Sequence, residues 1–192
     1  MKNAKKLFEN TYIISSCHFS TKMVRFGVFL APFVVGAAAL TPDTMSFYSL
    51  SATRGDGSTQ VMEDCRGKVV YATNVASKWG ATRREYAQFK RLGERWGDDL
   101  VILGFPTLEF GGQEFSTDEE IKAFAEKQGF PGTLMKLGNI IGDDAPEVWK
   151  YLKSESGASD PTWNFNGKFL VDKEGNVSVP KGDVEAEIES LM

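Results

Sequence analysis

Residues 68–105, KVVYATNVASKWGATRREYAQFKRLGERWGDDLVILGF, carry the pattern that decides the fold. They begin with a β-prone run, Lys68–Asn74, and end with a continuous apolar run, Leu100–Phe105, which is typical of a strand covered on both faces of a sheet. Between the two runs, Thr82–Trp96 has helical spacing and places four large side chains on one stripe: Tyr86, Phe89, Leu92 and Trp96. A strand, a helix and a strand with so short a crossover predict a right-handed parallel unit.

The rest of the chain from Met45 continues this alternation of strands and helices. Gly55-Asp56-Gly57 predicts a hairpin turn between two short β-prone stretches, Phe47–Ala52 and Ser58–Met62. Two helix starts show a capping-box pattern, namely Thr82 with Glu85 and Thr117 with Glu120. The further elements expected are helices at Thr117–Gln128, Pro146–Lys153 and Asp183–Leu191, and an antiparallel hairpin of Lys168–Asp172 with Val177–Pro180. This order predicts a thioredoxin-like α/β fold, with a central mixed sheet flanked by helices and an N-terminal β-hairpin.

The charges are unevenly distributed along the 192 residues. Residues 1–44 hold five of the 22 Lys and Arg and two of the 26 Asp and Glu, which leaves 17 basic and 24 acidic residues in 45–192. An acidic body argues against nucleic acid as a partner. A basic, acid-poor start is typical of a targeting leader. We therefore predict a leader in 1–44 and one globular domain in 45–192, long enough to bury a core without disulfides or a metal.

An uncharged apolar run, Phe26–Leu40, supports the leader. The run is shorter than the ~20 residues that span a bilayer, and it suits the apolar region of a signal peptide with a small-residue cleavage site. Three alternatives stay open: a start at Met23, an organellar presequence in Met1–Lys22, and a buried N-terminal element of the fold. We expect the leader to engage a membrane or translocon and to direct the chain to the secretory pathway or an organelle. Without the leader the chain would be cytoplasmic.

Cysteine and histidine are scarce. The chain has two cysteines, Cys17 and Cys65, and one histidine, His18. Since Cys17 and His18 lie in the predicted leader, the domain keeps only Cys65, which excludes a disulfide framework and a cysteine metal site. The lack of histidine excludes Ser-His-Asp hydrolases and the common zinc enzymes. We expect no metal and no cofactor.

Four segments of the domain resemble motifs of the glutathione peroxidase family. The junction of the first core strand and first helix, Asn74–Thr82 (NVASKWGAT), is similar to the family signature NVASK(C/U)GxT except at Trp79. The other matches follow the family order: Arg66–Val70 (RGKVV) at the strand entry, Gly104–Glu114 (GFPTLEFGGQE) against GFPCNQFGxQE, and Trp163-Asn164-Phe165 with Lys168–Asp172 against the WNF segment and its strand. The resemblance covers about three-quarters of the chain and identifies it as a member of the family.

The resemblance implies reduction of hydrogen peroxide or organic and lipid hydroperoxides, in the response to oxidative stress. In the family a thiolate or selenolate attacks the O–O bond, and glutathione or another thiol, as co-substrate, reduces the resulting acid. The hydrogen-bond donors of the family map to Glu109, Trp163 and Asn164. Glu109 departs from the family glutamine, because an ionised carboxylate donates no hydrogen bond and raises the pKa of a neighbouring thiol. The alternatives are a solvent-facing Glu109, and a core Trp163 followed by a turn amide.

Trp79 stands where the reactive residue belongs and cannot perform this chemistry, since its indole only donates a hydrogen bond and does not ionise near neutral pH. One interpretation is a selenocysteine codon, UGA, written as Trp, whose codon UGG differs by one base. The lack of a resolving cysteine in Thr117–Pro131 agrees with a selenoenzyme reduced directly by glutathione. A second interpretation is a catalytically inactive homologue that acts as a binding or structural module, and a third is hydrophobic ligand binding around Trp79 and Trp163. Cys65 is a poor substitute, because it precedes the first core strand at the wrong end.

The resemblance also bears on assembly. Tetrameric family members carry an interface loop between the second helix and the WNF segment, and Lys136–Thr162 is compact here. We therefore expect a monomer whose open site admits bulky lipid hydroperoxides.

Overall fold

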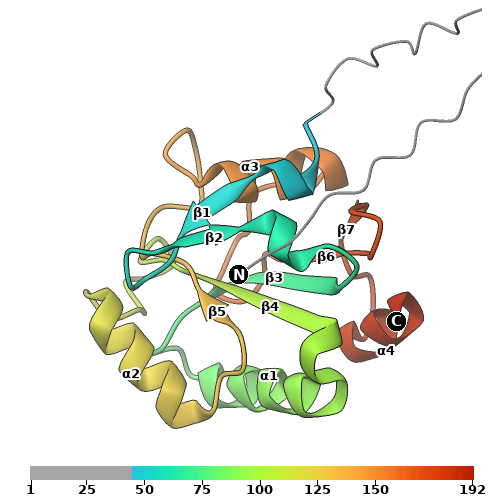
Figure 1. The fold of residues 1–192 in the computed structure, drawn as a ribbon. Helices are drawn as coiled ribbons and strands as arrows, with labels where there is room; N and C mark the ends of the chain where they lie inside the picture. Colours follow the sequence, from blue (N-terminus) through green and yellow to red (C-terminus); the bar gives the residue numbers. More distant parts are fainter. Residues whose placement is uncertain (1–44) are drawn as a thin grey trace, which may run out of the picture. The chain divides into compact units, whose positions relative to one another are not determined.

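The computed structural model describes residues 45–192, so the predicted leader lies outside the described residues. Its centre is a five-stranded sheet in the order β5-β4-β3-β6-β7 (Figure 1). The strands of this sheet are β3 (Val69–Val75), β4 (Leu100–Pro106), β5 (Thr133–Leu134), β6 (Lys168–Val171) and β7 (Val177–Ser178). β3 pairs with β4 in parallel and with β6 in antiparallel, so the sheet is mixed, as predicted.

Helices lie on both sides of this sheet (Figure 1). They are α1 (Thr82–Trp96), α2 (Asp118–Gln128), α3 (Glu147–Ser156) and α4 (Val184–Leu191). Figure 1 shows α1 and α4 below the sheet, and α3 above it together with the hairpin of β1 (Ser51–Thr53) and β2 (Thr59–Val61). The predicted thioredoxin-like architecture with an N-terminal hairpin is therefore confirmed.

The strand β3 explains why the sheet needs covering on both faces. All seven of its residues are buried, and alternate residues enter opposite cores. Tyr71 belongs to the core under α1 and α4, whereas Val70 and Ala72 belong to the core under α3 and the hairpin. Because side chains of a strand alternate between faces, an unbroken apolar run satisfies both layers at once.

Local signals located most elements. Thr117 caps α2 as predicted, since its Oγ1 accepts a hydrogen bond from the Glu120 N–H at 3.3 Å. Pro146 is the N-cap residue of α3, one position earlier than its predicted place in the first turn. The short strand β5 was not predicted, because two residues carry too little periodicity to indicate a strand.

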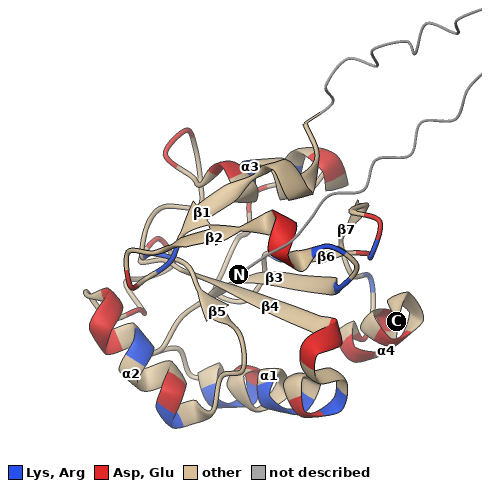
Figure 2. Cartoon of the chain, in the orientation of Figure 1, with Lys and Arg blue, Asp and Glu red and all other residues tan. Residues whose placement is uncertain are grey.

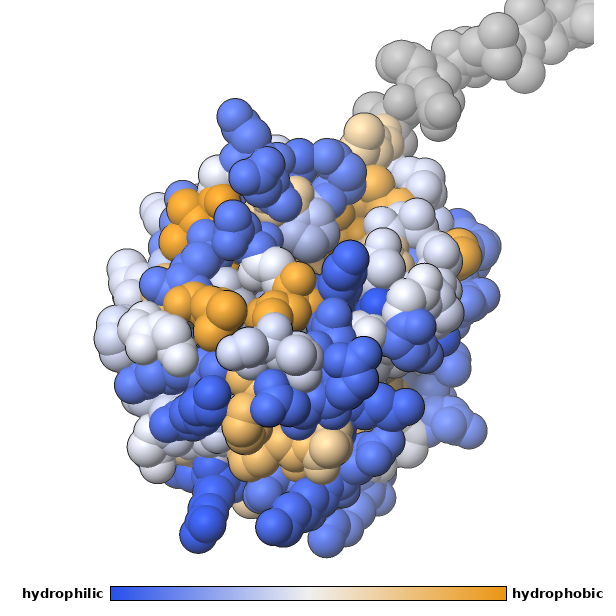
Figure 3. Space-filling view, turned by 90° about the vertical axis from the view of Figure 1, so that its left-hand side faces the viewer, coloured by the Kyte–Doolittle hydropathy of each residue, from blue (hydrophilic) through white to orange (hydrophobic). Residues whose placement is uncertain are grey.

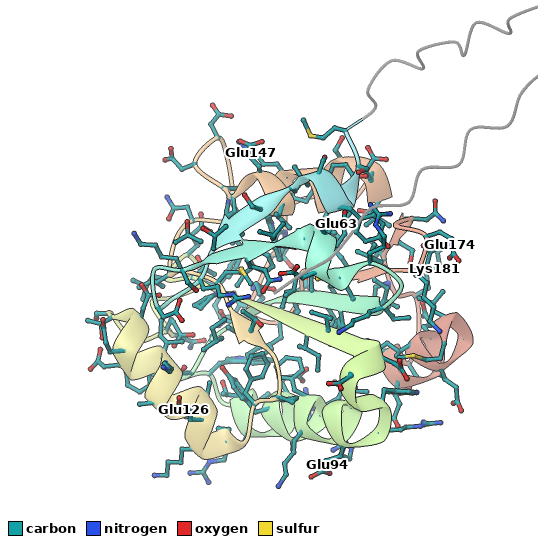
Figure 4. The ribbon with its side chains drawn as sticks, in the orientation of Figure 1. Glu63, Glu94, Glu126, Glu147, Glu174 and Lys181 are labelled. Carbon is teal, nitrogen blue, oxygen red and sulfur yellow. The ribbon has the colours of Figure 1, made fainter. Side chains whose placement is uncertain are left out.

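Charged side chains cover the outer surface of the described domain. Figure 2 shows acidic residues distributed over α2, α3 and α4, while α1 carries most of its basic residues on its outer side. Glu94, Glu126 and Glu147 lie on the surface of α1, α2 and α3 respectively (Figure 4). No helix within residues 45–192 has the length and apolar character needed to cross a membrane.

Candidate active site

The connection from β3 to α1 places residue 79 just before the start of a helix. Thr82 closes this connection, because its Oγ1 donates to the Ala76 carbonyl at 2.6 Å and its N–H donates to the Trp79 carbonyl at 3.1 Å. The predicted capping box at Thr82 is therefore wrong: Ala81 is the N-cap residue and makes no side-chain cap. The hydroxyl of Thr82 is used to hold the loop instead of the helix end.

Trp79 is half-buried and lies against Phe165. The two rings are stacked, with centroids 5.6 Å apart and planes inclined by 24°. Phe165 itself is buried and has a φ of 56°, the one positive φ of a non-glycine residue in the described chain. Such a backbone conformation costs on the order of 1–3 kcal/mol and persists where the surrounding structure fixes it.

Asn74, at the end of β3, fixes the turn that carries Phe165. Its Nδ2 donates to the Trp163 carbonyl at 3.0 Å, and its Oδ1 accepts from the Gly167 N–H at 2.9 Å. Gly167 has no room for a side chain, since a Cβ there would lie 2.9 Å from the Trp149 ring. The turn of residues 163–167 is thus tied directly to the strand that leads to residue 79.

Trp163 and Asn164 both contact the loop that follows β4. Asn164 is buried, and its Nδ2 donates to Gln113 Oε1 at 2.7 Å and to the Phe110 carbonyl at 3.4 Å. Trp163 is 44% exposed and lies beside Phe110, with ring centroids 6.4 Å apart. The Lys78 N–H donates to the Gln113 carbonyl at 2.8 Å, so the same loop also adjoins position 79.

Glu109 is turned to another part of the structure. Its Oε2 accepts hydrogen bonds from the Ile140 N–H at 2.7 Å and from Thr107 Oγ1 at 3.1 Å. The carboxylate therefore fastens the chain after β5 to the end of β4. Within the described residues it makes no hydrogen bond to Trp79, Trp163 or Asn164, and its predicted role in catalysis stays a prediction.

A buried carboxylate, Glu114, lies directly beneath the residue-79 loop. Its Oε1 accepts from the N–H groups of Ser77 and Phe115 at 3.1 and 2.8 Å, while its Oε2 has no partner within the described residues. Burial, which disfavours the charged form, raises the pKa of Glu114, and the hydrogen bonds from Ser77 and Phe115 oppose that rise. Lys78 also holds this segment, because its Nζ donates to the Glu114 carbonyl at 3.0 Å.

Cys65 lies outside this cluster. It is 1% exposed and precedes β3, whereas position 79 follows the opposite end of that strand. Desolvation raises the pKa of its thiol to about 11, so little thiolate forms at neutral pH. Cys65 does not substitute for a reactive residue at position 79.

The sequence interpretation assigned no role to Gln113, Glu114 or Phe165, although all three lie in the matched segments. The signal that could have found them is the pairing of the QE and WNF segments, which the structure brings together through Gln113 and Asn164. A surface cavity of about 350 Å³ between α2, β5 and the β1–β2 turn is separate from this cluster, and none of Trp79, Trp163 and Asn164 lines it. Figure 3, which shows the side of the molecule with α2, has apolar side chains in several separate patches among charged ones.

The family model for glutathione peroxidase matches residues 47–153. The chain belongs to the glutathione peroxidase family. It is 42% identical over 147 residues to the mitochondrial glutathione peroxidase 1 of Chlamydomonas reinhardtii, which covers 74% of this chain and 73% of that relative. It is 34% identical over 179 residues to the phospholipid hydroperoxide glutathione peroxidase of Callithrix jacchus, covering 88% of this chain and 90% of the relative.

Solved structures agree with this assignment. The apo crystal structure of Trgpx matches with a TM-score of 0.58 and 30% identity, over 77% of this chain and 94% of the other. Glutathione peroxidases use a thiol co-substrate in place of a prosthetic group. Within the described domain, no group of three or more His, Cys, Asp or Glu side chains is arranged to hold a metal ion.

Proposed function

We propose that this glutathione peroxidase homologue reduces hydroperoxides with glutathione, and that its reactive group is a selenocysteine at position 79 that the sequence writes as Trp. The observation that carries the proposal is the intact surrounding of that position. Asn74 holds the turn of Trp163 and Asn164, and the Gln113 loop joins this turn to Lys78. Only the side chain at position 79 lacks the required chemistry.

The reaction requires a group that is ionised at neutral pH. The selenolate attacks the O–O bond of the hydroperoxide and becomes a selenenic acid, while the departing oxygen takes a proton and leaves as an alcohol or water. One glutathione thiol then forms a selenium–sulfur bond and releases water. A second glutathione displaces the selenolate, so that glutathione disulfide and a proton are the remaining products. The start of α1, three residues beyond position 79, favours the negative charge.

The substrate that best suits the exposed surroundings of this site is a bulky hydroperoxide. Trp163 is 44% exposed and Leu108 is 43% exposed, and both belong to segments that adjoin the cluster. Apolar side chains at the rim of an open site favour lipid chains over hydrogen peroxide. A relative named for phospholipid hydroperoxide supports this choice.

The codon for residue 79 tests the selenium assignment directly. We expect UGA in the transcript, followed by a selenocysteine-insertion hairpin. A UGG codon would overturn the assignment and leave a chain without a peroxide nucleophile.

A recombinant Trp79→Cys variant tests the peroxidase scaffold independently of the codon. We expect glutathione-dependent loss of phospholipid hydroperoxide by this variant and none by the chain with Trp79, because only a thiolate attacks the O–O bond. Trp79→Ser is the matched control, since its hydroxyl does not ionise at neutral pH. A second change, Cys65→Ser, should leave the turnover of the cysteine variant intact. Turnover by the chain with Trp79, or by the Trp79→Ser control, would contradict the proposal.

A further inference from the structure

The amide of Asn164 has no N–H left to donate to a reactive group. An asparagine side chain has two N–H bonds. In this structure they are directed at Gln113 Oε1, 2.7 Å away, and at the Phe110 carbonyl, 3.4 Å away. The Oδ1 of Asn164 is buried and has no partner within residues 45–192. The opposite orientation of the amide is disfavoured, because it would set Oδ1 against the Phe110 carbonyl oxygen.

Glu109 does not replace the missing donor. Its carboxylate accepts two hydrogen bonds, from Ile140 and Thr107, and the Ile140 bond at 2.7 Å joins it to a different loop. Drawing Glu109 into the site would leave the Ile140 N–H without this partner. Since an unpaired backbone N–H is costly, the present position of Glu109 is the favoured one.

Gln113 has the donors that Asn164 and Glu109 lack. Its Oε1 accepts from Asn164, so the orientation of its amide is fixed and both N–H bonds of its Nε2 remain outside that pair. Its backbone carbonyl accepts from the Lys78 N–H at 2.8 Å, one residue before position 79. Gln113 is therefore tied on one side to the residue-79 loop and on the other to the Trp163–Asn164 turn.

We propose that Gln113 supplies the side-chain amide N–H that stabilises the ionised reactive group at position 79, while Asn164 orients Gln113 and Glu109 serves only to hold the Ile140 loop. This inference rests on the proposed function, because it concerns a thiolate or selenolate at position 79. It differs from the resemblance, which puts the amide donor at position 109.

The test measures the pKa of the thiol in the full-length Trp79→Cys chain, from the pH dependence of its alkylation by iodoacetamide. Peptide mass spectrometry assigns the alkylation to residue 79, so that Cys17 and Cys65 do not contribute. Two further changes are made at Gln113 in this background. Gln113→Leu removes both donor and acceptor, whereas Gln113→Glu keeps an acceptor for Asn164 and removes the donor. Circular dichroism checks that each variant folds.

We expect both Gln113 changes to raise the thiol pKa by about one unit, because a hydrogen bond to a charged group contributes on the order of 1.5–3 kcal/mol. If Gln113→Leu raises the pKa and Gln113→Glu does not, Gln113 only positions Asn164 and the proposal is overturned. Glu109→Gln is the matched comparison and should leave the thiol pKa within about 0.3 units, less than one hydrogen bond contributes. A lowered pKa in that variant would mean that position 109 reaches the site, which also overturns the proposal.

Peroxide turnover separates this inference from the proposed function. If the Trp79→Cys chain shows no turnover but its thiol pKa responds to Gln113, the inference stands and the peroxidase proposal fails. If turnover is present and the pKa ignores Gln113, the peroxidase proposal stands and the inference fails.

Discussion

At the scale of single residues, Trp79 lies on the rim of the site and not in the core. Its ring stacks on Phe165 and stays half-exposed, so a smaller side chain there removes a surface contact and leaves the two cores of the sheet intact. A half-exposed stack of two rings contributes about 0.5–1.5 kcal/mol beyond its buried area. The scaffold therefore tolerates cysteine or selenocysteine at position 79 at small cost in stability.

Glu114 predicts a specific pH dependence of stability. Burial raises its pKa in the folded chain above the ordinary 4.5, so the folded chain retains a proton that the unfolded chain has released. The free energy of unfolding should therefore fall as the pH rises above 4.5, by up to about 1.4 kcal/mol per pH unit, until Glu114 ionises in the folded chain. Glu114→Gln abolishes this loss, so its advantage over the original chain grows with pH. Urea unfolding at about pH 5 and about pH 7 measures the difference.

The control for Glu114 is Glu119→Gln, the same chemical change on the exposed surface of α2. It should alter the free energy of unfolding by less than about 0.5 kcal/mol. An original chain and a Glu114→Gln variant that differ by the same amount at both pH values would contradict the prediction.

At the scale of elements, the contact of α1 with the turn after α2 depends on one small residue. A Cβ at Gly93 would lie 2.6 Å from Cβ and Cγ of Pro131. Helix propensity favours Gly93→Ala by about 1 kcal/mol, but overpacking costs about 1–3 kcal/mol, and the ring of proline has little freedom to move. We therefore expect Gly93→Ala to lower the free energy of unfolding in urea.

Gly80→Ala is the matched control for this contact, because nothing lies within 4 Å of a Cβ built at Gly80. Its effect on stability should be within about 0.5 kcal/mol. If Gly93→Ala proves more stable than the original chain, α1 moves away from Pro131 more easily than the structure indicates.

At the scale of the whole molecule, the surface of the described domain favours a monomer. The exposed large apolar side chains are scattered, namely Met45, Val61, Leu108, Trp163 and Val179, and Figure 3 shows no continuous apolar face on the side that carries α2. Stable homodimers bury a contiguous apolar core patch. Sedimentation should therefore give a single species of 21.2 kDa. A species of twice that mass at micromolar concentration would contradict this expectation.

The sequence by itself determined the layers of the fold. The unbroken apolar runs at β3 and β4, the stripe on α1 and the cap at Thr117 report burial and local geometry, which depend on neighbours within one element. The family motifs likewise identified the family without any coordinates. The capping box at Thr82 failed because a hydroxyl that is able to cap a helix is equally able to close a loop, and only the path of the loop to Ala76 decides between them.

Only the tertiary structure decided which side chains meet at the site. Gln113 and Asn164 are 51 positions apart, and Asn74 and Gly167 are 93 apart. Glu109 could be mapped to the site by its place in a motif, yet its carboxylate is bound to Ile140, 31 positions away. Periodicity shows that a side chain is buried, but the identity of its hydrogen-bond partner depends on loops that are positioned by the packing of the whole sheet. The physical reason is that a polar group binds whichever complementary group the fold brings within reach.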